Sequence, residues 1–110
     1  MLFGEYLREL RGRKSLRQTD IAESLGISTV YVCDIEKGRR NPPSSEKLDI
    51  LVQRMSLTDK EASLLFDLAG RARGSVAPDI IKYLEEHPCA KDAIRRIIAQ
   101  SIDYNWNNIP

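Results

Sequence analysis

The sequence predicts an all-α protein in which a five-helix domain is followed by a helical C-terminal extension. Apolar residues recur at helical spacing along nearly all of its 110 residues, and no segment shows the sustained alternation of a strand. Short clusters containing Gly, Pro or Ser separate these segments. Hydrophobic residues make up 42% and charged residues 30% of the chain, a composition typical of folded domains rather than disordered ones.

The first three helices are predicted at residues 2–13, at residues 18–25, and between Ser28 and Gly38. Ser28 is a suitable N-cap, because its hydroxyl can accept a hydrogen bond from a backbone N–H of the first turn. Gly38 tolerates the left-handed conformation that ends many helices. The residues expected to face the core are Phe3, Tyr6, Leu7, Leu10, Ile21, Ala22, Leu25, Val32 and Ile35.

Two more helices complete the predicted domain. One begins after Ser44 or Ser45, and the other follows Thr58, which has capping-box spacing to Glu61, and runs to about Ala69. Their expected core residues are Leu48, Ile50, Leu51, Met55, Leu64, Leu65 and Leu68.

A domain boundary is predicted at residues 70–74, which hold two glycines and two arginines. It divides the chain into a domain of residues 1–70 and an extension of residues 71–110. In the extension, helices are expected from Pro78 to Glu86 and over residues 90–101, and His87-Pro88 interrupts them.

The stretch from Leu16 to Pro42 carries the strongest functional signal. Two short amphipathic segments meet at a tight corner at Gly26, and the basic run Lys37-Gly38-Arg39-Arg40 follows the second segment. The net charge is only +1, but bases cluster on both sides of the corner while acids gather later in the chain. From charge alone, the bases either form one face for phosphates or are solvated charge runs near helix ends. This pattern is typical of a helix-turn-helix whose second helix enters the major groove of DNA.

Residues 3 to about 69 resemble the Cro/phage-repressor type of helix-turn-helix domain, the XRE family. The matching positions are Leu7-Arg8-Glu9-Leu10-Arg11, Leu16, Gln18, Ile21-Ala22, Gly26-Ile27-Ser28, Ile35-Glu36, Gly38 and Pro42. The resemblance implies a lambda-repressor-like fold and a partly buried ion pair between Arg11 and Glu36.

The same resemblance implies two sets of DNA-contacting residues around the second helix of the motif. The outward positions expected to read base edges are Ser28, Thr29, Val30, Cys33 and Asp34. The positions expected to hold the phosphate backbone are Arg17, Gln18, Lys37, Arg39, Arg40 and Asn41. For each base-reading position the alternative is an ordinary exposed helix residue, and for Cys33 that alternative is preferred.

The extension has two interpretations. Its apolar residues either pack back on the domain or form a dimer interface, which reading a palindrome would require. The dimer is favoured, and the residues expected to form it are Ile80, Ile81, Leu84, Ile94, Ile97 and Ile98.

Together these features predict a cytoplasmic regulator that binds double-stranded DNA. It is expected to be a repressor of phage, plasmid or mobile-element type that binds a pseudo-palindromic operator as a homodimer. Two alternatives remain open. The chain could be an antitoxin that binds a toxin and autoregulates its operon, or a protein-interaction scaffold that has lost DNA binding.

Other function classes find little support in the sequence. There is one histidine, no nucleophile–base pattern and no glycine-rich phosphate loop after a strand, so a non-enzyme without a cofactor is expected. Cys33 and Cys89 are far apart, and with His87 they do not provide the four ligands of a closed metal site. No apolar run approaches the roughly 20 residues of a membrane span, so no membrane partner is expected.

Overall fold

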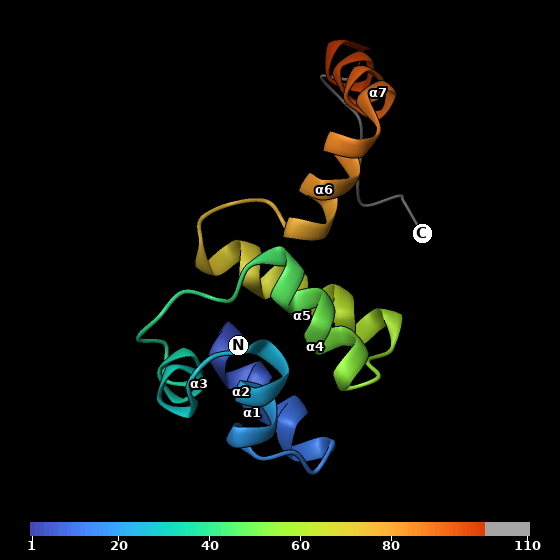
Figure 1. Cartoon of the computed structure of the whole chain (residues 1–110). Coiled ribbons are helices and arrows are strands. Elements are labelled where there is room, and N and C mark those ends of the chain that lie inside the picture. The colour runs from blue at the N-terminus through green and yellow to red at the C-terminus, as the bar shows by residue number, and fades with distance from the viewer. Residues whose placement is uncertain (101–110) are drawn as a thin grey trace. The chain divides into compact units, whose positions relative to one another are not determined.

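The computed structural model describes residues 1–100, and this part of the chain holds seven helices and no strand (Figure 1). The prediction of an all-α fold is therefore confirmed. The helices are α1 (Phe3–Arg13), α2 (Gln18–Leu25), α3 (Thr29–Glu36), α4 (Ser45–Arg54), α5 (Asp59–Ala72), α6 (Pro78–Glu86) and α7 (Pro88–Gln100). The predicted last residue of the seventh helix, Ser101, lies outside the described residues.

The chain forms two compact units, and the first of them ends at Asp79 rather than at the predicted residue 70. Helix α5 runs past its predicted end at Ala69 to Ala72. Gly70 then lies so close to the next segment that a Cβ on it would stand 2.8 Å from the backbone nitrogen of Ala77. Because Ala77 is itself buried, the residues after α5 belong to the first unit.

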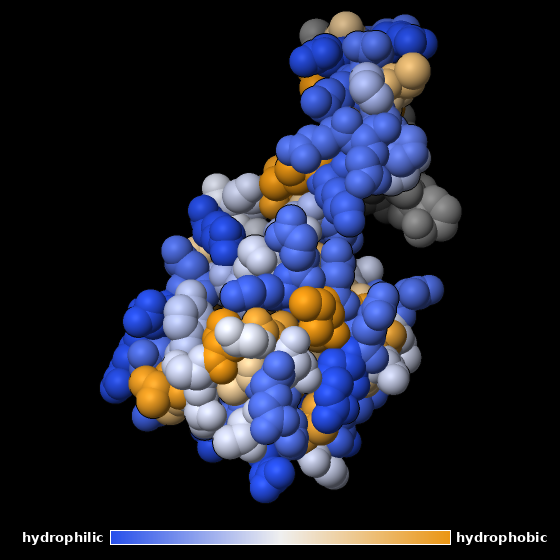
Figure 2. Space-filling model, in the orientation of Figure 1, coloured by the Kyte–Doolittle hydropathy of each residue, from blue (hydrophilic) through white to orange (hydrophobic). Residues whose placement is uncertain are grey.

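The first unit is built around one hydrophobic core. Helix α2 packs against α3 and α4, while α1 packs against α3 and α5. The largest fully buried side chains are Leu7, Leu10, Ile21, Val32, Ile35, Leu48, Leu51, Met55 and Leu65. On the face that Figure 2 shows, hydrophobic side chains of this unit lie scattered among polar ones.

The prediction placed two residues in the core wrongly. Ile50 is 43% exposed and Leu64 is 41% exposed. In α5 the buried stripe includes Leu65, Phe66 and Leu68, so the stripe is rotated away from Leu64 and takes in a phenylalanine that the prediction omitted. In α4 the stripe follows Leu48 and Leu51, and Ile50 lies about 100° around the helix from Leu51.

Each helix of the first unit ends in the same way. The residue that follows the last turn has a left-handed backbone, and the N–H after it donates to a carbonyl in the last turn, as in the Schellman motif. The left-handed residues are Ser15, Gly26, Gly38, Ser56 and Gly74. Leu16, Ile27 and Leu57 directly follow three of them and pack against the core. Each of these three corners is therefore fixed by a backbone hydrogen bond and by an apolar contact.

The predicted N-terminal caps are present. The Ser28 hydroxyl accepts from the Tyr31 N–H at 3.1 Å, and Thr58 and Glu61 form the reciprocal capping box. The Thr58 N–H is the main cause that lowers the pKa of the Glu61 carboxyl, and Lys14 and Arg13 of the α1 end lower it further.

The second unit contributes α7 and most of α6. No residue in either helix is buried, although both carry apolar residues at helical spacing. Cys89 is exposed and lies in the first turn of α7, which begins at Pro88. Among residues 1–100, no helix combines the length and the apolar character needed to cross a bilayer.

Gly4 allows α1 to approach the end of α3 closely. A Cβ on Gly4 would lie 2.4 Å from the carbonyl oxygens of both Ile35 and Glu36, whereas one on Gly12 of the same helix would meet nothing within 4 Å. We expect Gly4→Ala to lower the free energy of unfolding by about 2–3 kcal/mol because backbone must move. Gly12→Ala, the matched control, should raise it by about 0.5 kcal/mol. Equal effects in urea denaturation would contradict this packing.

Ser56 and Ser15 occupy left-handed positions that normally favour glycine, with φ of 49° and 55°. We expect Ser56→Gly to raise the free energy of unfolding by about 1 kcal/mol, because a side chain destabilises this conformation. The same change at Ser63, which is exposed inside α5, should lower it by about 0.5 kcal/mol. A loss of stability in both variants, measured by thermal or urea unfolding, would contradict the strain assigned to Ser56.

Candidate nucleic-acid interface

A buried carboxylate, that of Glu36, joins the first three helices. Its side chain is only 4% exposed at the end of α3. Arg11 of α1 donates from Nε to Glu36 Oε2 at 2.8 Å and from Nη2 to Oε1 at 3.2 Å. Gln18 at the start of α2 donates from Nε2 to the same Oε1 at 3.0 Å. One acceptor pair thus fixes α3 relative to both preceding helices.

The Arg11 guanidinium is also held from a third direction, because its Nη1 donates to the carbonyl of Leu16 at 3.1 Å. The ion pair that the resemblance implied is bidentate and is part of a larger network. A buried ion pair adds little net stability over apolar packing, but loss of one partner leaves a charge stranded. The network therefore specifies the arrangement of α1, α2 and α3.

The start of α2 presents an exposed cation. Arg17 occupies the N-cap, and its side chain does not accept a hydrogen bond; instead its backbone N–H donates to Asp20 Oδ2 at 2.8 Å. This hydrogen bond is the main cause that lowers the pKa of the Asp20 carboxyl. The Arg17 side chain remains 83% exposed, with Nε 3.6 Å from Asp20, so most of its guanidinium faces solvent.

The predicted base-reading residues lie on α3 and its cap with different accessibility. Val30 is 70% exposed, whereas Thr29 and Cys33 are half-buried. Ser28 uses its hydroxyl oxygen to cap α3. Val32 and Ile35 point into the core from the opposite side of the same helix. Near the start of α3, Val30 is therefore the predicted base-reading side chain that is most accessible, and Thr29 is accessible in part.

Asp34 differs from its neighbours, because two cations from the following loop surround it. Its Oδ1 lies 3.9 Å from Arg39 Nη1, and its Oδ2 lies 3.7 Å from Arg40 Nε. The Arg40 guanidinium also lies over the ring of Tyr31, 4.5 Å from the ring centroid. The Asp34 carboxylate therefore lies between two cations of the loop and offsets part of their positive charge.

Three of the predicted DNA-contacting residues line one cavity, together with Arg8, which the sequence analysis did not assign to the interface. A cavity of about 180 Å³ is lined by Gln18, Cys33 and Lys37, together with Arg11, Glu36 and Arg8. Arg8 was not among the predicted DNA-contacting residues. Its spacing of three from Arg11 on α1 is the signal that could have placed both on one side of the helix.

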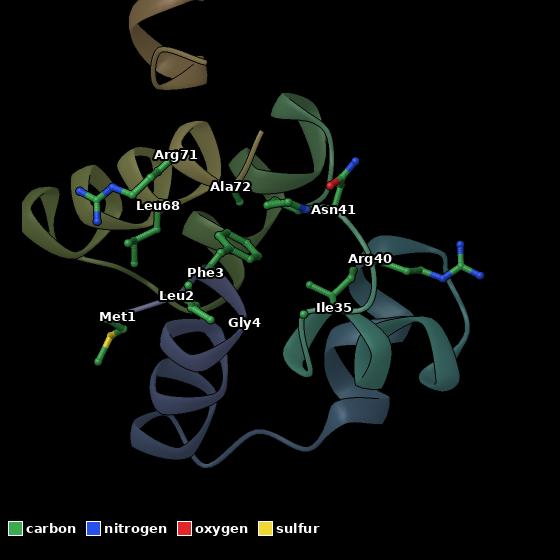
Figure 3. A pocket seen from close by; sticks show the side chains of 12 residues that line it. Met1, Leu2, Phe3, Gly4, Ile35, Arg40, Asn41, Leu68, Arg71 and Ala72 are labelled. Atoms are coloured by element: carbon green, nitrogen blue, oxygen red, sulfur yellow. The ribbon is translucent and has the colours of Figure 1, made fainter. Parts of the chain in front are cut away.

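The loop that carries Arg40 and Asn41 is supported from behind by apolar residues. These two residues border a second cavity of about 180 Å³, lined chiefly by Leu2, Phe3 and other side chains of the first unit. Figure 3 shows the guanidinium of Arg40 pointing away from the apolar side chains of this cavity. Arg73 at the end of α5 donates to the carbonyl of Pro42, which ties the loop to α5.

The described residues show no arrangement suited to metal chemistry. Within residues 1–100, no three His, Cys, Asp or Glu side chains come together as metal ligands, and both cysteines are free thiols. The chemistry that the surface around α3 offers is hydrogen bonding, apolar contact and positive charge.

Comparison with known proteins defines the class to which this fold and surface belong. Residues 2–65 match the helix-turn-helix domain family, and the chain belongs to that family. The resemblance to Cro/phage-repressor regulators is thereby confirmed.

Two relatives make the comparison more specific. The chain is 46% identical over 54 residues to the HTH-type transcriptional regulator DdrOP3 of Deinococcus deserti, an alignment that covers 49% of this chain and 41% of the relative. It is 44% identical over 39 residues to the ImmF control region 10 kDa protein of Bacillus phage phi105, covering 36% of this chain and 43% of the relative. The chain therefore matches less than half of each relative's length.

Proposed function

We propose that this protein is a cytoplasmic transcriptional regulator that binds double-stranded DNA at a specific operator. Membership of the helix-turn-helix family supports DNA binding. One relative is named a transcriptional regulator and the other a protein of a phage control region. These names favour a repressor of phage, plasmid or mobile-element type.

The observation that carries the proposal is that α3 has one buried side and one accessible side. The core and the Glu36 network hold its inner side in place. On its outer side Val30 is exposed, and Thr29 lies half-buried in the first turn. In the proposed complex the outer side of α3 reads base edges in the major groove. The proposed phosphate contacts come from Arg17, Gln18, Lys37, Arg39, Arg40 and Asn41.

The operator is best found by selecting bound DNA from a random pool. We expect Val30→Ala to change the selected consensus, because the shorter side chain would lose most of the apolar contact with a thymine methyl. Arg39→Ala combined with Arg40→Ala should instead weaken binding to all sequences and lower the slope of log K against log salt by about 2. An unchanged consensus for Val30→Ala would remove it from the base-reading set. A changed consensus for the arginine variant, with its salt slope intact, would contradict the phosphate role.

We further propose that the protein binds a pseudo-palindromic operator as a homodimer formed through α6 and α7. Neither helix has a buried residue, yet Ile80, Ile94 and Ile98 are each more than 40% exposed. The charges of the two helices are complementary: α6 carries three acids and one lysine, whereas α7 carries three bases and one aspartate. A second copy could therefore pair α6 with α7 of its partner, covering the apolar residues and matching the charges.

This dimer is tested by placing an acid on the apolar side of α7. We expect Ile98→Asp to shift the dimer–monomer equilibrium toward monomer at least tenfold in sedimentation equilibrium, because a carboxylate would be buried. The control is Ala99→Asp, which adds the same charge about 100° around the helix. A wild-type protein that stays monomeric at high micromolar concentration, with and without DNA, would contradict the dimer.

A further inference from the structure

The loop after α3 holds an arrangement that phosphate contacts alone do not require. Asp34 makes three separate connections to this loop. Its two carboxylate oxygens face Arg39 and Arg40, and its backbone carbonyl accepts from the Arg39 N–H at 2.8 Å. Tyr31, one turn earlier on α3, holds Arg40 from the other side. Side chains of α3 thus hold both guanidinium groups close to that helix.

We propose that Asp34 is a positioning residue that restrains Arg39 and Arg40 and thereby limits binding to DNA that lacks the operator. This positioning role replaces the base-reading role expected for Asp34. This inference rests on the proposed function, since it concerns how the same surface discriminates between DNA sequences.

The geometry favours restraint over base reading. A carboxylate that reads cytosine must accept a hydrogen bond from its amino group. Here each oxygen already faces a cation, and the Asp34 side chain is 24% exposed, compared with 69% for Arg39 and 53% for Arg40. The separations of 3.7 and 3.9 Å exceed hydrogen-bond length, so the attraction is mainly coulombic. Such an attraction orients the arginines and still permits them to reach a phosphate.

The consequence follows from how the two kinds of complex are stabilised. Binding to non-operator DNA depends almost entirely on phosphate neutralisation. A carboxylate beside two arginines opposes every such complex. In the operator complex the phosphates lie at fixed positions relative to α3. Arginines that are already positioned for this arrangement lose less freedom on binding there, which offsets the opposing charge of the carboxylate. Asp34 therefore weakens non-operator binding more than operator binding.

The test is Asp34→Asn, which removes the charge and keeps the shape. We expect binding to non-operator DNA to become roughly fivefold tighter at 0.1 M salt, and the slope of log K against log salt to steepen by about 1. The ratio of operator to non-operator affinity should fall at least threefold. The control is Asp67→Asn on α5, which removes the same charge outside this cluster. It should leave that ratio within a factor of about 1.5.

Two results would overturn the proposal. If Asp34→Asn altered the preferred base at one operator position and left non-operator binding unchanged, Asp34 would be a base reader. If it matched the Asp67→Asn control in both slope and ratio, Asp34 would have no special role.

A second measurement, on the protein without DNA, separates this inference from the proposed function. Relaxation of the Nε–H groups of Arg39 and Arg40 should show both side chains more mobile in Asp34→Asn than in the wild type. Equal mobility would contradict the restraint whatever the protein binds. If the restraint is observed but the wild type binds no DNA, the proposed function fails, and with it the role of Asp34 in discrimination.

Discussion

The buried carboxylate of Glu36 is the constraint on which the arrangement of α1, α2 and α3 depends. An isolated helix as short as α3 would not be stable in water, so its position must come from its partners. Arg11 and Gln18 hold the Glu36 side chain, while Gly4 allows α1 to pack on the carbonyls of the same turn. Two contacts near opposite ends of α1 therefore fix the end of α3. These contacts therefore also set the direction in which the outer side of α3 faces.

Much of the fold was predictable because its signals are local. The caps at Ser28 and Thr58 and the corner at Gly26 depend on residues within a few positions of one another, and each was read correctly from the sequence. The Ser15-Leu16 and Ser56-Leu57 corners repeat the pattern of Gly26-Ile27, a left-handed residue followed by an apolar one that packs on the core. Recognising this pattern would also have marked the end of α4.

What the sequence did not predict depends on distant contacts. Helical spacing shows that α5 has an apolar stripe, but only packing decides that Phe66 is inside and Leu64 outside. The close approach of Gly70 to Ala77, which extends the first unit beyond the predicted boundary, involves two segments that periodicity treats separately. At the candidate interface, Asp34 was expected to read a base edge. Its pairing with Arg39 and Arg40 was not predicted, because it depends on how the loop folds back after Gly38.

The two sides of α3 have a consequence for how such a protein can diverge. Val32, Ile35 and Glu36 carry the packing, whereas Val30 is largely solvent-exposed and contributes little to the core. Substitutions on the outer side therefore meet weak selection from folding, and the inner side can stay unchanged while the outer side varies. Under the proposed function, single substitutions on the outer side would change the DNA target while the domain stays folded.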